Sequence, residues 1–191
     1  GDAGGPLRTH ITGPYGYDVT LSPDDQRQGP FCSPLTSEER ERCLAVPRET
    51  DPKVRAVAQT IARGQSGQTG RAAAVVQYLL SNYGYSQTFN AGAGDPISNF
   101  ILGKKPAHCQ YFASAAVVLL RCLGVPARYV QGYYAHESGG AGVTIVRQRD
   151  AHAWAEAWMD GLGWVTLDAT PGGGRPDHTA SALPFWQKGW D

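Results

Sequence analysis

Apolar residues recur at helical spacing in three segments of the first two thirds of the chain. The first segment opens with Asp51-Pro52, an N-cap residue followed by a proline that suits the first turn of a helix. A second segment covers 69–82, and a third, 107–123, is apolar on nearly all sides, which is typical of a buried helix. The pattern therefore predicts two amphipathic helices followed by one buried helix, with a further short helix near 37–43.

Strand patterns dominate the last third of the chain. Candidate strands lie at 127–134, 143–149, 151–158 and 164–168, and a glycine-bearing turn at 160–163 separates the last two. The 151–158 run alternates strictly, with four alanines on one face and larger side chains on the other: His152, Trp154, Glu156 and Trp158. We therefore predict an α+β domain in which the buried helix packs on an antiparallel sheet.

Segments without periodicity mark the ends of this domain. Residues 1–50, rich in glycine, proline and polar side chains, are expected to form an irregular N-terminal arm or cap. Residues 51–172 are expected to form the main domain, with loops at 85–106 and around 139–140, and 173–191 a Gly/Pro-rich linker and tail. Because the chain opens with Gly-Asp-Ala-Gly-Gly and not with Met, we expect it to be a piece of a longer protein.

Composition narrows the class of protein. The 191 residues carry 17 basic and 17 acidic side chains with no basic stripe, which argues against a nucleic-acid partner. No apolar run reaches the ~20 residues that a membrane-spanning helix needs. Of the four cysteines, Cys32 and Cys43 lie in the irregular arm and could bridge each other or remain free thiols. Cys109 and Cys122 share the predicted buried helix and are too far apart to bridge.

Cys109 lies in the first turn of the predicted buried helix, a position that favours a reactive thiol. Backbone N–H groups and the helix dipole stabilise a thiolate there, and the same N–H groups can bind an oxyanion. His152 opens one strand of the predicted hairpin, and Asp168 closes the next. With a register centred near residue 160 or 161, these two are opposite or diagonal neighbours on one face. Asp168 can then orient His152 towards Cys109.

Each of these residues also has an ordinary structural explanation. Buried cysteines are common, a single strand histidine is more often a packing residue, and an aspartate before Ala-Thr-Pro more often belongs to a turn. The three could also bind zinc with His108 as a fourth ligand, although the spacing matches no standard zinc site. A non-catalytic interaction module that keeps the fold is the other alternative. All three residues together, on a helix start and two paired strands, favour catalysis.

The sequence around these residues resembles the core of the bacterial transglutaminase-like superfamily over roughly residues 50–172. The resemblance is carried by HCQYFASA at 108–115, LGVPARYV at 123–130, DAHAWAEAW at 150–158 and LDATP at 167–171. It implies a papain-like fold and a Cys-His-Asp triad in that chain order, formed by Cys109, His152 and Asp168. One departure is Ala107, which stands where the family often has glycine, so a positive φ there would be strained.

The resemblance also implies a reaction, a partner and a location. The reaction is acyl transfer from a protein or peptide amide, such as a glutamine side chain, through a thioester on Cys109, with no cofactor or metal. A lysine amine accepts the acyl group in transamidation, and water accepts it in deamidation or proteolysis. Candidates for a second oxyanion donor are Tyr83, Tyr85 and Asn99. The relatives are extracytoplasmic domains of large bacterial membrane proteins, so we expect this chain to act outside the cytoplasm, tethered by membrane segments elsewhere.

Overall fold

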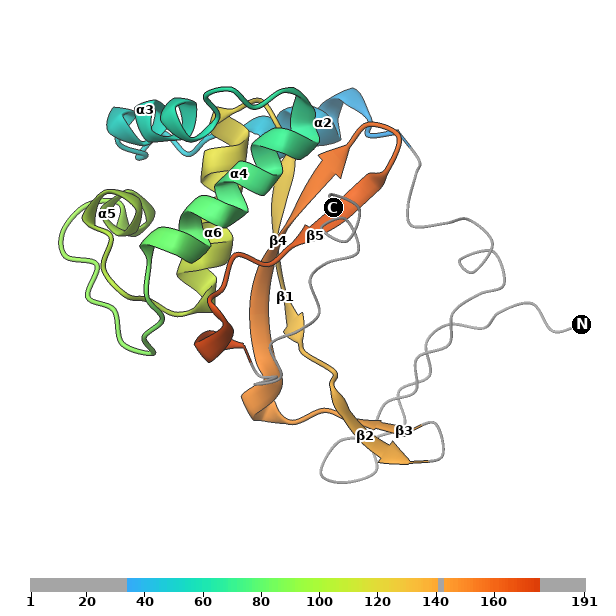
Figure 1. Cartoon of the computed structure of the whole chain (residues 1–191). Helices are drawn as coiled ribbons and strands as arrows, with labels where there is room; N and C mark the ends of the chain where they lie inside the picture. Colours follow the sequence, from blue (N-terminus) through green and yellow to red (C-terminus); the bar gives the residue numbers. More distant parts are fainter. Residues whose placement is uncertain (1–33, 141–142, 176–191) are drawn as a thin grey trace, which may run out of the picture.

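A layer of helices packs on one side of a three-stranded sheet (Figure 1). The computed structural model describes residues 34–140 and 143–175. The α-helices in these ranges are α2 (Ser37–Leu44), α3 (Pro52–Ile61), α4 (Gly67–Asn82), α5 (Pro96–Gly103) and α6 (Cys109–Cys122). The sheet has the order β1-β4-β5, formed by β1 (Ala127–Tyr133), β4 (Ala151–Met159) and β5 (Gly163–Leu167). The predicted α+β class is confirmed.

Helices α2 and α3 begin where the sequence supplies a cap. Thr36 forms a capping box with Glu39 at the start of α2, and Asp51 accepts a hydrogen bond from the Lys53 N–H at the start of α3. Helix α4 begins at Gly67, two residues before the predicted start, and ends at Asn82 as predicted. These three elements therefore follow local signals in the sequence.

The prediction of loop throughout 85–106 was wrong, because this stretch contains α5. Asp95 caps α5 through the N–H groups of Ile97 and Ser98, and Pro96 occupies its first turn. An Asp-Pro pair also begins α3, so the sequence did contain a start signal for this helix. The helix is stabilised by burial of Phe100 and Ile101 in the core, because its eight residues are too few to be stable alone.

The β4–β5 hairpin has the predicted register. Trp158 lies opposite Trp164 and Glu156 opposite Thr166, which centres the turn on Gly161. Gly161 adopts φ 81°, a conformation that glycine reaches without steric cost. On its other edge β4 pairs with β1, where His152 lies opposite Gly132. The register therefore brings Asp168, just beyond β5, to a diagonal position from His152.

The segment between β1 and β4 forms a separate two-stranded ribbon. It consists of β2 (Glu137–Gly140) and β3 (Val143–Ile145), followed by a 3-10 turn at Gln148–Asp150. The expected loop around 139–140 is therefore partly a strand, and the expected strand at 143–149 is shorter than predicted. An ion pair between Glu137 and Arg147 (2.6 Å) joins the start of β2 to the residues that follow β3.

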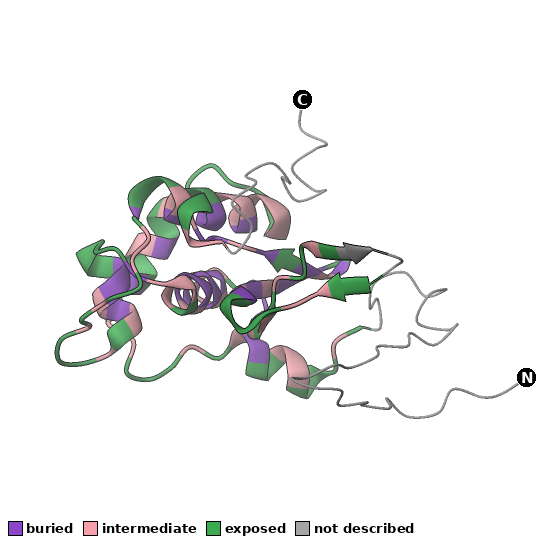
Figure 2. Ribbon diagram, turned by 90° about the horizontal axis from the view of Figure 1, so that it is seen from below, coloured by how far each residue is buried: buried purple, intermediate pink, exposed green. Residues whose placement is uncertain are grey.

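Helix α6 lies at the centre of the core, between the other helices and the sheet. Buried residues gather on α6 and on the strand that it packs against (Figure 2). The alanine face of β4 lets the helix approach closely, and Ala155 and Ala157 are fully buried there. Gly124, with φ 73°, ends the helix. Residues 109–122 thus form the predicted buried helix.

Part of the expected arm lies outside the described residues. Residues 1–33 include Cys32, so its pairing with Cys43 is outside them as well. Among the described cysteines, Cys43, Cys109 and Cys122, none is bridged to another. None of the helices in the described part of the chain has both the length and the hydropathy to span a bilayer.

Candidate active site

Cys109 is the first residue of α6, and its approach segment is held by backbone pairing. His108 takes the N-cap position. Just before it, Ala107 accepts a hydrogen bond from the Ser86 N–H (2.9 Å) and donates one to the Gly84 carbonyl (3.2 Å). Ala107 is not among the described non-glycine residues with positive φ, so the replacement of the family's glycine causes no backbone strain. The thiol is half-buried at the helix N-terminus.

His152 connects Cys109 with Asp168. The imidazole is buried, with only 3% of the residue exposed, and its Nε2 lies 3.0 Å from Asp168 Oδ2. The thiol of Cys109 interacts with the same ring, and this interaction lowers the pKa of the thiol. Trp154 stacks beside the imidazole and Tyr134 meets it edge-on, with centroids 6.2 Å and 6.1 Å away. The structure therefore brings the three predicted residues together.

The early end of β5 opens a place for the sulfur beside β4. Backbone groups of even-numbered β4 residues face β1, as the bond from the Trp158 N–H to the Pro126 carbonyl shows. The backbone groups of odd-numbered β4 residues therefore face β5, but the pairing between β4 and β5 stops at Ala155 and Leu167. The N–H of Ala153 is left without a strand partner and is directed to the sulfur of Cys109, whose pKa it helps to lower. The sequence analysis did not anticipate this contact.

The pKa shifts at the site favour an ion pair. Burial alone would raise the pKa of Cys109, but hydrogen bonds from His152 and the Ala153 N–H, with the charge on the imidazole, outweigh it and lower that pKa. Burial would lower the pKa of His152, but its contacts with Asp168 and Cys109 raise it to about 9. Both shifts therefore favour the thiolate–imidazolium pair over the neutral pair.

Asp168 is held from three directions. Burial would raise the pKa of its carboxyl, but the hydrogen bond and charge of His152, the Thr170 N–H and the Arg175 guanidinium together lower that pKa. Thr170 donates its N–H to Oδ1 (2.9 Å), while Arg175 Nε lies 3.3 Å from Oδ2. The carboxylate thus stays ionised and faces His152. Arg175 was not identified from the sequence, because composition assigned it to a linker.

Two of the three candidate oxyanion donors are already engaged elsewhere. The Tyr83 hydroxyl donates to the Ile101 carbonyl (2.7 Å), and burial raises its pKa. Both amide hydrogens of Asn99 bond to the carbonyls of Ala91 and Ala93, at 2.8 Å each. Tyr85 remains: its backbone is bridged to Ala107, two residues before Cys109, and its pKa is raised first by burial and then by the charge of Cys109.

The charge of Cys109 also acts on Tyr129 of β1. Burial and then the charge of Cys109 raise the pKa of its phenol, although 38% of the residue is exposed. Glu156, on the His152 face of β4, pairs with Arg128 at 2.6 Å. Glu156 is therefore engaged by Arg128.

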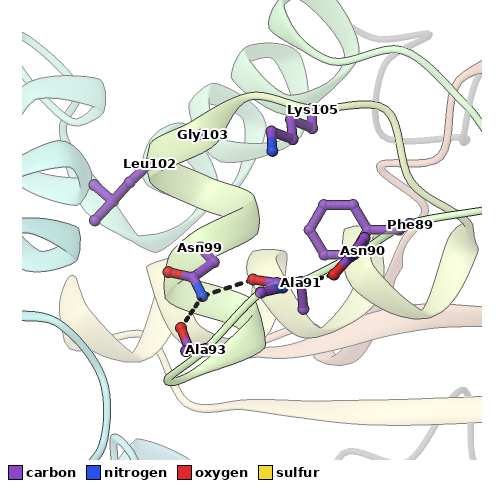
Figure 3. Close-up of a pocket in the computed structure, with 9 residues that line it drawn as sticks. Phe89, Asn90, Ala91, Ala93, Asn99, Leu102, Gly103 and Lys105 are labelled. Atoms are coloured by element: carbon purple, nitrogen blue, oxygen red, sulfur yellow. Dashed lines mark hydrogen bonds between the residues drawn. The ribbon is translucent and has the colours of Figure 1, made fainter.

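Other ligand sites were sought among the described residues. They contain no group of three or more His, Cys, Asp or Glu side chains placed to hold one metal ion. A cavity of about 400 Å³ lies between α5 and the loop before it (Figure 3). It is lined by Phe89, Asn90, Ala91, Gly92, Ala93, Asn99, Leu102, Gly103 and Lys105. Its Asn99 amide holds the loop carbonyls, so this side chain has a structural task there.

Comparison with known proteins identifies the family. Residues 55–169 match the family described as the transglutaminase-like superfamily. The chain belongs to this superfamily. The match contains Cys109, His152 and Asp168, and it ends before Arg175.

Superfamily members with substantial similarity come from several bacteria. The chain is 31% identical over 156 residues to a protein-glutamine gamma-glutamyltransferase of Pseudomonas aeruginosa, an alignment that covers 81% of this chain and 23% of that protein. It is 32% identical over 151 residues to the uncharacterised protein YebA of Bacillus subtilis, covering 74% and 20%. The chain thus spans only about a quarter or less of these relatives.

Solved structures of superfamily members share the fold. The periplasmic domain of TgpA from Pseudomonas aeruginosa, bound to ethylmercury, aligns with a TM-score of 0.63 and 31% identity, over 71% of this chain and 49% of that one. A candidate cysteine protease from Cytophaga hutchinsonii aligns with a TM-score of 0.54 and 25% identity, over 76% and 47%. Both comparisons agree with a papain-like arrangement of helices and antiparallel sheet.

Proposed function

We propose that this protein catalyses thiol-dependent acyl transfer on protein or peptide amides, with Cys109 as nucleophile, His152 as acid and base, and Asp168 as the group that orients His152. The observation that carries the proposal is the double contact of His152. Its Nε2 meets Asp168 at 3.0 Å, and its ring also interacts with the thiol of Cys109. Such a chain activates a nucleophile and orients its base at once.

The first half of the reaction forms a thioester. The Cys109 thiolate attacks the carbonyl carbon of a carboxamide, and the oxygen gains negative charge in the tetrahedral intermediate. The N–H of Cys109 at the start of α6 stabilises this oxyanion, with the Tyr85 hydroxyl as the second donor that we propose. When the C–N bond breaks, the imidazolium of His152 gives its proton to the leaving amine. The products are ammonia or an amine and an acylated Cys109.

The second half returns the enzyme to its resting state. Neutral His152 takes a proton from a lysine amine or from water as that group attacks the thioester carbonyl. The C–S bond then breaks and Cys109 leaves as a thiolate. Asp168 stabilises the imidazolium that forms in this step and keeps its Nε2 oriented. Transamidation, deamidation and proteolysis share this thioester, and the similarity to a gamma-glutamyltransferase favours glutamine as the acyl donor.

We also propose that the reaction takes place outside the cytoplasm, in a domain tethered to membrane segments that lie elsewhere. The similarity to the periplasmic domain of TgpA supports this location. The protein substrate would then be a periplasmic or cell-surface protein.

Mass spectrometry of an amine-labelling reaction tests the proposed chemistry. A glutamine-rich protein is incubated with the enzyme and a primary-amine probe, and each glutamine is examined for amine incorporation, conversion to glutamate or backbone cleavage. The intact protein should produce one of these products, and Cys109→Ala should produce none while keeping its circular dichroism spectrum. Cys122→Ala, on the same helix, is the matched control and should remain active. Product formation by Cys109→Ala would refute the proposal.

A further inference from the structure

The chain beyond β5 turns back over the candidate active site and touches it at two points. After Asp168, the segment Pro171–Arg175 contains a 3-10 turn at Gly172–Gly174. Its last residue, Arg175, contacts the Asp168 carboxylate. Its third glycine, Gly174, lies against the ring of Tyr85, so closely that a Cβ there would overlap the ring. The two contacts link the orienting carboxylate with the proposed oxyanion donor.

Arg175 binds the turn that carries Asp168 as well as the carboxylate itself. Its Nε lies 3.3 Å from Asp168 Oδ2 and donates to the Thr170 carbonyl at 3.1 Å, while Nη2 donates to the Asp168 carbonyl at 3.3 Å. The side chain is largely buried, with 24% exposed. A planar fork that reaches three oxygens holds a geometry that a single ammonium cannot hold. Such contacts differ from a surface ion pair, which contributes little.

Lack of space for a side chain, and not backbone conformation, requires glycine at position 174. None of the three glycines at 172–174 is among the described residues with positive φ, so each could be alanine on conformational grounds. Gly172 and Gly173 have open space where a Cβ would stand, whereas Gly174 has the Tyr85 ring. Glycine is therefore required at Gly174 by its contact with Tyr85, whereas no such contact requires it at Gly172 or Gly173.

We propose that the segment Pro171–Arg175 positions the active site, with Arg175 holding Asp168 against His152 and Gly174 seating the ring of Tyr85. Arg175 is thus a positioning residue that acts through Asp168, and it does not touch the substrate. The proposal rests on the function proposed above for Asp168 and Tyr85. Without Arg175 only the Thr170 N–H would hold the carboxylate, which would then face His152 for a smaller share of the time.

The pH dependence of thiol alkylation by iodoacetate tests the role of Arg175 without any substrate. This anionic reagent reacts fastest when thiolate and imidazolium coexist, so the alkylation rate falls once the imidazolium loses its proton at high pH. The pH at which the rate falls, called here the high-pH limb, reports the coupled titration of the pair. The groups that face His152 are Cys109, Asp168 and the aromatic rings of Tyr134 and Trp154. In Arg175→Gln the limb should move down by about half a pH unit or more, because the imidazolium loses part of its carboxylate partner.

The matched control is Arg40→Gln, which removes an exposed arginine that pairs with Asp160 at 3.4 Å in the β4–β5 turn. It should leave the limb unchanged. An unchanged limb in Arg175→Gln would overturn the proposal. An upward move would also overturn it, because it would show that Arg175 acts only as a competing positive charge. If Arg175→Gln does not fold, Arg175→Lys should move the limb down by less, since it keeps the charge and loses the fork.

Alanine substitutions in the glycine run test the seat of Tyr85. Gly174→Ala should lower kcat for amine incorporation about tenfold or more with little change in KM, because a displaced donor weakens the transition state and not substrate binding. Gly173→Ala should behave as the unmodified protein. In a Tyr85→Ala background, Gly174→Ala should cause no further loss, because the overlap is gone. A further loss in that background, or equal effects of the two alanines, would overturn the role of Gly174.

The two measurements keep this inference separate from the proposed function. Alkylation reports Cys109, His152 and Asp168 whether or not amide substrates react. If the limb moves in Arg175→Gln but no amine is incorporated by the unmodified protein, then positioning by Arg175 holds and the proposed reaction fails. If amine is incorporated and the limb does not move, the reverse holds.

Discussion

The imidazole of His152 lies 3.0 Å from the carboxylate of Asp168, although His152 belongs to β4, Asp168 follows β5, and neither lies opposite the other. Asp168 lies one residue beyond β5, at a diagonal position, and its carboxylate reaches Nε2 from the side. This contact orients the ring, which also interacts with the thiol of Cys109.

Replacement of Asp168 by asparagine should reduce amine incorporation by about a thousandfold or more, by analogy with serine triads, because the amide favours the wrong tautomer of His152. The measurement is kcat/KM with a peptide glutamine donor. Asp160→Asn is the control, since Asp160 sits exposed in the β4–β5 turn. Full activity in Asp168→Asn would reduce Asp168 to a turn residue.

Cys109 should react with iodoacetamide at a lower pH than Cys122, which lies on the same helix. Burial raises the pKa of Cys122, whereas the contacts with His152 and Ala153 lower that of Cys109. At pH 6.5, peptide mapping should show Cys109 labelled more than about tenfold faster, since each pKa unit changes the thiolate fraction tenfold. Equal rates at this pH would show that Cys109 is not activated in the unliganded protein.

The His152 ion pair should make stability depend on pH in one direction. The pKa of His152 is about 9 when folded and ~6.5 in an unfolded chain, so its contribution is fully present below pH ~6.5 and is lost as pH rises through about 9. The difference in Tm between the unmodified protein and His152→Gln should therefore shrink between pH 6.5 and pH 9. A difference that stays constant across this interval would contradict the raised pKa.

Loss of the α5 cap should destabilise the domain. Asp95 accepts hydrogen bonds from the N–H of Ser98 (2.9 Å) and from its buried hydroxyl, which in turn accepts from the Asp51 N–H (2.8 Å). Asp95→Ala should lower the free energy of unfolding by about 1–2 kcal/mol in urea. Asp51→Ala removes one capping bond, to Lys53, and should cost less. The opposite order would show that the Ser98 network contributes little.

Much of the fold and the three proposed catalytic residues could be predicted from local patterns. Apolar spacing located α3, α4 and α6, and strict alternation located β4, because burial against a layer on one side imposes these periods directly on the sequence. Matching parity on two strands of a short hairpin was sufficient to place His152 near Asp168. These inferences depend on contacts that are close in sequence or repeat with a simple period.

Other features depend on where elements end, which local patterns do not record. The N–H of Ala153 becomes available to Cys109 only because β5 stops at Leu167. Arg175 reaches Asp168 because the chain turns back after Pro171, in a segment whose composition is typical of a linker. Helix α5 was missed because its eight residues follow two glycine turns, although Asp95-Pro96 repeats the signal that begins α3.

Because the β4–β5 hairpin is centred on Gly161, the length of its turn determines whether Asp168 can reach His152. His152 and the turn lie at opposite ends of β4, roughly 20 Å apart at the usual rise of a strand. One residue inserted between Asp160 and Leu162 would move every β5 side chain to the other face and take the carboxylate away from the imidazole. Two inserted residues would restore the face but displace the carboxylate along the strand. The sequence of the turn can therefore vary, at positions that tolerate φ > 0, while its length is constrained by the proposed active site at the other end of the strand.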